Sequence, residues 1–232
     1  RSHNEAVVEK LQFYVDYLKQ GEYHLEDIYG STPFKVDVNT LRPQLLDKIV
    51  KVVFLSDKKY RLEIDFNGGF GSAQNYKTKE ISSLSLPQNT IAKEYNLGDP
   101  VDFPYFNFKL NPTDIPVEIG KEYLIKFNAF NGVVSRYRGI GLDQTPTGSS
   151  ILTLSLTGTN KARLVDYLNS SVNVLSETQL ERKNLFATRT IKFIDSSLAV
   201  KTAEMSSVQE ELDSFRDNNS SVGIGGSEEG LI

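Results

Sequence analysis

The chain has 232 residues, a formal net charge of −4 at pH 7 and no cysteine. Its length suits one large domain or two small ones, and its share of apolar and charged residues is that of a folded protein. The lack of cysteine excludes disulfides, thiolate metal sites and cysteine catalysis, and the acidic balance argues against nucleic acid as the main partner. No apolar run approaches the roughly 18 residues that a membrane-spanning helix needs.

The first segment, residues 4–21, has apolar side chains at helical spacing. They recur at steps of four, three and four residues: Val7, Leu11, Tyr14 and Leu18. This spacing predicts one helix, with Asn4 as its N-cap and Gly21 at its end.

Between residues 32 and 130 the apolar period changes from helical to alternating. Residues 49–66 predict a β-hairpin, because two apolar runs flank a short polar turn. Residues 122–130 predict a further strand, and residues 101–110 predict one whose phase slips at Pro104, as at an edge strand or a bulge. Together these runs predict a mostly antiparallel β unit of about a hundred residues.

The last third of the chain predicts one more strand and a very long helix. Helical spacing returns briefly at residues 131–140, and residues 151–157 alternate as a strand with one apolar face. Asn160 is a candidate N-cap for the next helix. From Leu164 to Asn219 the chain holds no proline or glycine, which predicts a helix about 85 Å long at 1.5 Å per residue.

Residues 187–215 of this helix carry a heptad pattern. Steps of four and three residues alternate along a line of apolar side chains that only a lysine interrupts: Ala187, Ile191, Ile194, Leu198, Lys201, Met205, Val208, Leu212 and Phe215. Such a narrow a/d line is typical of pairing with another long helix. A helix packed on its own domain is the alternative interpretation, but the length favours a projecting helical arm. We expect a return helix as its partner, entered through the breaker-rich residues 217–226 and the segment SEEGLI, and hence a chain that is part of a larger protein.

These patterns together predict an α+β fold. We expect an α/β base with a β-rich, mostly antiparallel insertion and a long C-terminal helical arm that is truncated here. The predicted parts are residues 1–36 for the first helix and the start of the base, 37–130 for the insertion, 131–176 for the rest of the base, and 177–232 for the arm and a flexible turn.

Three stretches resemble the chain-length determinant (Wzz-type) polysaccharide co-polymerases. The resemblance lies in GSSILTLSLTGTNKARLVDYLN (148–169), in LERKN…ATRTIKFID (180–195), and in VDYLKQGEYHLEDIYGSTPFKV (15–36). Within that family the chain is most similar to the class fused to a cytoplasmic exopolysaccharide tyrosine autokinase. The resemblance covers residues 131–219 well and residues 1–36 more weakly, and the β-rich middle lies outside it.

The resemblance implies a place on the periplasmic side of the bacterial inner membrane, with flanking membrane helices as anchors and the α/β base next to the membrane. It implies a homo-oligomeric ring that works with a separate polysaccharide polymerase and export machinery, and that sets chain length or helps to export capsular or exopolysaccharide. Charged residues near the start of the arm, Glu181, Arg182 and Arg189, are then candidates for a subunit interface. A solvated helix face is the other interpretation of these residues.

Catalytic, cofactor and metal sites are not expected. The only histidines are His3 and His24, and they lack a companion at metal-ligand spacing. The glycine-rich stretches at 67–71 and 223–226 predict loops rather than phosphate-binding loops, because neither has the Gly-Lys-Ser/Thr sequence.

Aromatic residues in the β unit have two interpretations. A core is favoured by their alternation, and a sugar-stacking platform is the alternative for Phe103, Tyr105, Phe106, Phe108, Tyr123 and Phe127. Tyr76 and Tyr95 lie in turn-rich stretches and are candidates for a glycan surface.

A binding and assembly module is therefore expected rather than an enzyme. A periplasmic adaptor of a secretion or efflux system is the alternative function, because such adaptors also join β domains to helical hairpins. An enzyme acting on a surface glycan is a more distant third, since paired carboxylates need a spacing that a sequence does not show.

Overall fold

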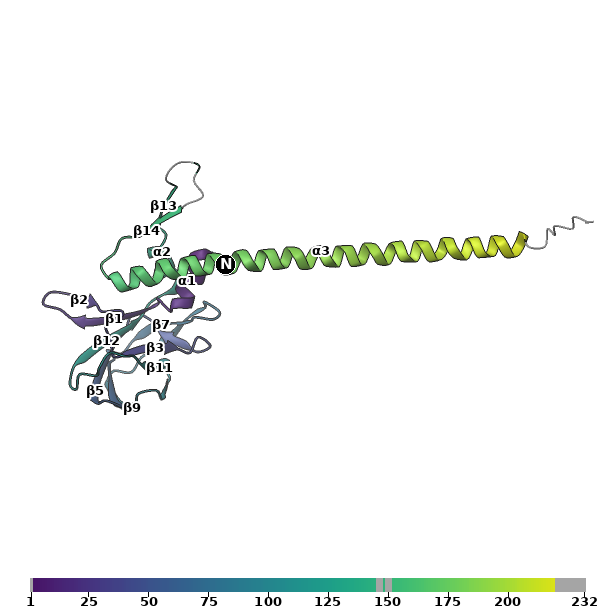
Figure 1. Ribbon diagram of the computed structural model, residues 1–232. Helices are drawn as coiled ribbons and strands as arrows, with labels where there is room; N and C mark the ends of the chain where they lie inside the picture. Colours follow the sequence, from purple (N-terminus) through teal and green to yellow (C-terminus); the bar gives the residue numbers. More distant parts are fainter. Residues whose placement is uncertain (1, 145–147, 149–151, 220–232) are drawn as a thin grey trace, which may run out of the picture. The chain divides into compact units, whose positions relative to one another are not determined.

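The structure is a computed structural model that describes residues 2–144, 148 and 152–219 (Figure 1). The chain divides into two compact units, Arg1–Leu175 and Ser176–Ile232, and each is described by itself. The predicted α+β fold, with antiparallel sheets and a long C-terminal helix, is confirmed.

The largest sheet of the first unit has six strands in the order β2-β1-β12-β5-β6-β9, and every neighbouring pair is antiparallel. The strands of this sheet are β1 (Val15–Gln20), β2 (Leu25–Asp27), β5 (Ile49–Ser56), β6 (Lys59–Asp65), β9 (Thr90–Asn96) and β12 (Glu122–Phe127). Strands from the N-terminal region and from the middle of the chain therefore share one sheet.

Three smaller sheets complete the β structure of the described residues. One contains β10 (Pro100–Phe103), β11 (Phe106–Pro112) and β3 (Phe34–Val38); one contains β4 (Pro43–Leu45), β7 (Phe70–Asn75) and β8 (Ile81–Ser85); one contains β13 (Gly141–Gln144) and β14 (Leu152–Ser155). The helices are α1 (His3–Leu11), α2 (Phe130–Arg136) and α3 (Lys161–Asn219). None of the helices within the described ranges combines the length and the apolar character that a membrane span requires.

Several elements agree with the sequence patterns. Strands β5 and β6 form the hairpin expected at residues 49–66, and β12 and α2 lie where alternating and helical spacing indicated them. The helix α3 is continuous through residues 187–215, as the heptad pattern predicted.

The predicted helix over residues 4–21 is wrong in its second half. Ser2, not Asn4, caps α1: its hydroxyl accepts a hydrogen bond from the backbone N–H of Glu5 in a capping box. The helix ends at Leu11, and its C-cap residue Gln12 has a left-handed φ of 52°. Strand β1 then pairs with β12. The apolar residues of 13–18 can be buried in a strand as well as in a helix, and pairing in the sheet decides between the two.

Two further expectations are corrected in the middle of the chain. The phase slip at Pro104 is neither a bulge nor an edge within one strand, because Pro104 lies in the tight turn between the antiparallel strands β10 and β11. Residues 67–71 are not wholly a loop, since β7 begins at Phe70 and pairs with β8. Strands β7 and β8 were not predicted from the sequence, because serine and glycine stand where apolar residues would alternate.

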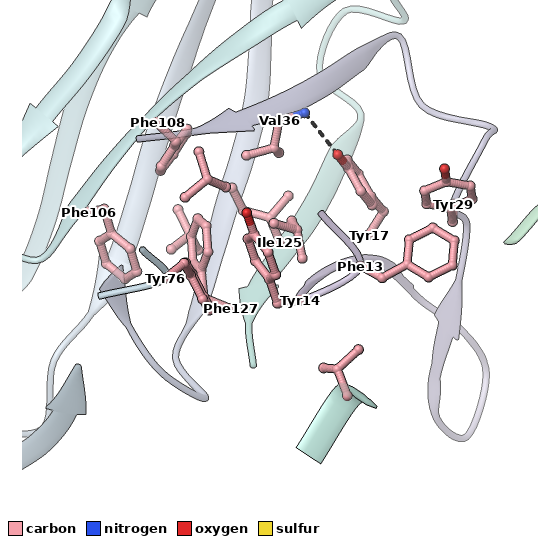
Figure 2. Packing of buried hydrophobic residues seen from close by; sticks show 14 of the residues in the cluster. Phe13, Tyr14, Tyr17, Tyr29, Val36, Tyr76, Phe106, Phe108, Ile125 and Phe127 are labelled. Carbon is pink, nitrogen blue, oxygen red and sulfur yellow. Dashed lines mark hydrogen bonds between the residues drawn. The ribbon is translucent and has the colours of Figure 1, made fainter. Parts of the chain in front are cut away.

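The core of the first unit lies between the six-stranded sheet and the β10-β11-β3 sheet (Figure 2). Phe34 of β3 packs against the rings of Phe54 and Tyr123, with centroids 5.9 and 5.6 Å away. Phe106 and Phe108 of β11 meet the ring of Phe127 at 5.5 and 5.6 Å. Contacts between aromatic side chains therefore join the two sheets.

Buried tyrosines extend this core toward α1. Tyr14 stacks on Tyr76 with ring centroids 3.8 Å apart, and the Tyr76 hydroxyl donates to the carbonyl oxygen of Asn128. The Tyr17 oxygen accepts a hydrogen bond from the backbone N–H of Val36, as the dashed line in Figure 2 shows. Burial raises the pKa of Tyr17 to about 12, so this tyrosine is neutral at physiological pH.

Replacing Phe127 with alanine should lower the free energy of unfolding by about 3–5 kcal/mol, because the side chain is fully buried and touches two rings of the facing sheet. The matched control is Phe70→Ala, since Phe70 is 82% exposed; its effect should stay within about 0.5 kcal/mol. Urea unfolding followed by circular dichroism measures both. Equal losses in the two variants would contradict the core described here.

Candidate functional site

The first turn of α3 is fixed to the β structure of its own unit. Asn160 accepts a hydrogen bond from the backbone N–H of Arg163, as predicted for an N-cap. Its side-chain amide also donates to the carbonyl oxygens of Asp27 and Tyr29, at 3.0 and 3.2 Å. One asparagine thus caps the helix and ties it to the end of β2.

Arg163 is the central residue of this joint. Its guanidinium is buried, and its Nε donates to Asp27 at 2.9 Å while an amino group lies 3.7 Å from Asp16. The group lies over two aromatic rings, 5.0 Å from the centroid of Phe13 and 4.6 Å from that of Tyr29. Paired carboxylates and ring faces together compensate a charge that would otherwise be unfavourable to bury.

Three tyrosines complete the joint around Arg163. Tyr167 of α3 stacks on Tyr137 with centroids 4.2 Å apart and planes inclined by 8°. The hydroxyl of Tyr29 donates to Asp166 at 2.7 Å. Gly30, at φ +79°, lets the turn after β2 approach the helix, because a Cβ there would come within 2.9 Å of Ala162.

The second unit has a different character, because its apolar side chains are exposed. From Gln179 to Asn218 every described residue of α3 is exposed. The sequence-predicted interface residues lie here and keep large exposed fractions: Ile191 59%, Ile194 55%, Leu198 64%, Met205 76%, Val208 63%, Leu212 41% and Phe215 66%. Together with Ala187 and Lys201 we call them the seam. Because α3 is continuous, their heptad spacing aligns them along one side of the helix.

The three charged candidates do not share that side. At about 100° per residue, Glu181 flanks the seam, whereas Arg182 and Arg189 point about 170° away from its midline. Among the residues that the structure describes, none of these three forms an ion pair within the chain. The geometry therefore separates Arg182 and Arg189 from the apolar candidates.

A second apolar line on α3 was missed by the heptad reading. Phe186, Phe193 and Val200 follow one another at seven-residue intervals and are 73%, 72% and 57% exposed. They lie about 130° from the midline of the seam. Their spacing was visible in the sequence, but the stronger a/d pattern beside them obscured it.

The aromatic residues of the β unit are mostly core. Phe106, Phe108, Tyr123 and Phe127 are buried, and Phe103 and Tyr105 are half-buried against the same cluster. Tyr76 is fully buried, so its expected place on a glycan surface is wrong. Tyr95 is half-buried and stacks on Tyr60 at 6.0 Å.

The described part of the chain brings together no group of three histidine or acidic residues that could hold a metal ion. A hollow of about 310 Å³ lies beside the joint, lined in part by Tyr17, Tyr29, Lys35 and Asp114. The faces and edges of the Tyr29 ring already contact Phe13, Tyr17 and Arg163, so this ring does not offer a free stacking platform. The exposed helix is therefore the stronger candidate for function.

Comparisons with known proteins leave the family open. No protein-family model matches the sequence, and no curated protein matches it. Two crystal forms of Xanthomonas campestris FlgL are similar in structure over 85% and 66% of this chain, at 14% and 12% identity, with TM-scores of 0.19 and 0.17. The chain spans 64% and 56% of the length of those two chains. Such low TM-scores carry no inference about fold or function.

Replacing Arg163 with methionine should lower the free energy of unfolding by about 3–5 kcal/mol, because Asp27 and Asp16 then lose their buried cation. Arg182→Met on the same helix is the matched control and should change it by no more than about 0.5 kcal/mol. Chemical denaturation of both variants checks this. A stability of Arg163→Met equal to that of the control would show that the joint does not depend on the ion pair.

Proposed function

We propose that this chain is the periplasmic part of an inner-membrane polysaccharide co-polymerase of the chain-length determinant type. In this role it oligomerises and regulates the chain length or the export of a capsular or exopolysaccharide. It acts by binding and assembly, and the polymer chemistry belongs to a separate polymerase.

The exposed seam on α3 is the observation that carries the proposal. A helix of 59 residues with contiguous exposed apolar side chains is suited to contact other helices. The stretches that resemble the co-polymerase family, residues 148–169 and 180–195, include β14, the cap at Asn160 and the first part of α3. The resemblance and the helix surface thus concern the same part of the chain.

A periplasmic adaptor of a secretion or efflux system is the second candidate. The combination of antiparallel β structure with a long helix supports it, although the same combination also suits the co-polymerase. The two functions differ in what a seam mutation should disturb. A co-polymerase would lose control of polysaccharide length, whereas an adaptor would lose transport of its substrate.

In cells that carry the full-length protein, the double substitution Ile194→Asp and Leu212→Asp should abolish the preferred length of the polysaccharide. Two carboxylates within the seam prevent apolar burial there, because an unpaired charge is unfavourable in an apolar contact. Gel separation of the surface polysaccharide measures the length distribution, and immunoblotting measures the protein.

Ser196→Asp with Ser206→Asp is the matched control, because both serines are exposed and lie away from the seam. It should keep the normal length distribution. An unchanged distribution in the seam variant, at normal protein level, would contradict the proposal. Normal polysaccharide together with lost export of another substrate would favour the adaptor.

A further inference from the structure

Charge is distributed unevenly along the part of α3 that bears the seam. Residues 181–201 hold five basic and two acidic side chains, a net charge of +3. Residues 202–219 hold one basic and five acidic side chains, a net charge of −4. The two halves of the exposed helix are therefore electrostatically complementary to each other.

Two copies of this helix can pair in two orientations, and the charges distinguish them. Parallel pairing would place each half beside a half of the same sign. Antiparallel pairing places the basic half of one copy along the acidic half of the other. The separation across two paired helices is 8–10 Å, about one Debye length at physiological salt, so this difference in energy is only partly screened.

Lys201 favours the same orientation. In an in-register parallel pair the d position of one helix faces the d position of the other, so Lys201 would face its own copy. In an antiparallel pair a positions face d positions, and Lys201 faces an apolar residue instead. Lys201 already forms an ion pair with Glu204 of its own helix at 2.6 Å, which offsets its charge beside the seam.

We propose that a second copy of this chain covers the seam in antiparallel orientation. The apolar line spans about four heptads, which is enough for a stable coiled coil. Its exposed residues, Ile194, Leu198, Val208 and Leu212 among them, supply the contact, and the charge asymmetry sets the direction. This pairing does not depend on the proposed role in polysaccharide synthesis.

One register buries the seam most completely. In this register the two-fold axis crosses the pair at the level of residue 203. The layers of the pair then join Ile194 with Leu212, Leu198 with Val208, and Lys201 with Met205 of the second copy. Phe186, Phe193 and Val200 stay on the outer side of such a pair, because they lie away from the seam. Each Lys201 then lies one layer from the axis and keeps its ion pair with Glu204 of its own helix.

Site-directed crosslinking tests the pairing, and the absence of native cysteine makes it unambiguous. Two variants of the whole chain are made, Ile194→Cys and Leu212→Cys, and treated with a short bismaleimide alone and after mixing. The antiparallel pair places residue 194 beside residue 212 of the other copy. It holds the two copies of residue 194 roughly 27 Å apart along the helix axis, at 1.5 Å per residue.

We expect a crosslinked dimer when the two variants are mixed. We expect no crosslinked dimer when either variant is treated alone. Ser196→Cys, on the side of α3 opposite the seam, is the control and should not crosslink. Self-crosslinking of Ile194→Cys would mean parallel pairing and would overturn the proposal. No crosslinked dimer in the mixture at high micromolar concentration, with the chain folded by circular dichroism, would overturn it as well. Neither of these failures bears on polysaccharide length control, which the seam variant tests separately in cells.

Discussion

The start of α3 depends on the buried ion pair that the Arg163 guanidinium forms with Asp27 and Asp16. The charge of this guanidinium lies among aromatic rings in the first unit and is compensated by Asp27 and Asp16. The arginine and Asp27 are 136 residues apart in the sequence, so this contact joins the N-terminal and C-terminal segments of the first unit. Without the arginine, Asp27 would lose its ion-pair partner and Asp16 would keep only the more distant Lys126 and Arg136, and without the carboxylates the arginine would be an uncompensated buried cation.

The two units of the chain differ in how their polar and apolar side chains are placed. In the first unit, the two buried glutamine side chains are hydrogen-bonded within the described residues: Gln44 bonds three carbonyl oxygens and the backbone N–H of Asn107, and Gln74 bonds the backbone of Lys79 and Phe130. In the second unit, apolar side chains along α3 remain exposed. Each buried Leu or Ile contributes about 1.5–3 kcal/mol, so a partner helix would gain substantially by covering the seam.

Local periodicity explains what the sequence alone could predict. The β5–β6 hairpin, β12, α2 and the whole of α3 carry their period within a short window, and each was anticipated. The seam was anticipated for the same reason, because its heptad lies within one helix. Its exposure was expected from the length of the helix, and the structure gives the exposed fraction of each side chain.

Contacts between distant segments explain what the sequence could not predict. The division of residues 3–20 into α1 and β1 is decided by pairing with β12, more than a hundred residues away. In the sequence Arg163 is one of several basic residues on a helix. Its contacts with Asp16, Asp27 and two aromatic rings appear only in the structure. Tyr76 looked exposed because its neighbours are polar, yet it stacks on Tyr14 inside the core.

The central claim is that the seam of α3 binds a helix of another copy of the chain. Hydrogen exchange at low and high micromolar protein concentration tests it most directly, because amides in an unsupported helix open readily and amides in a paired helix do not. If the seam is paired, the protection of residues 191–212 rises with protein concentration, while that of the core strand β5 stays constant. Protection of residues 191–212 that does not change with concentration would contradict the claim.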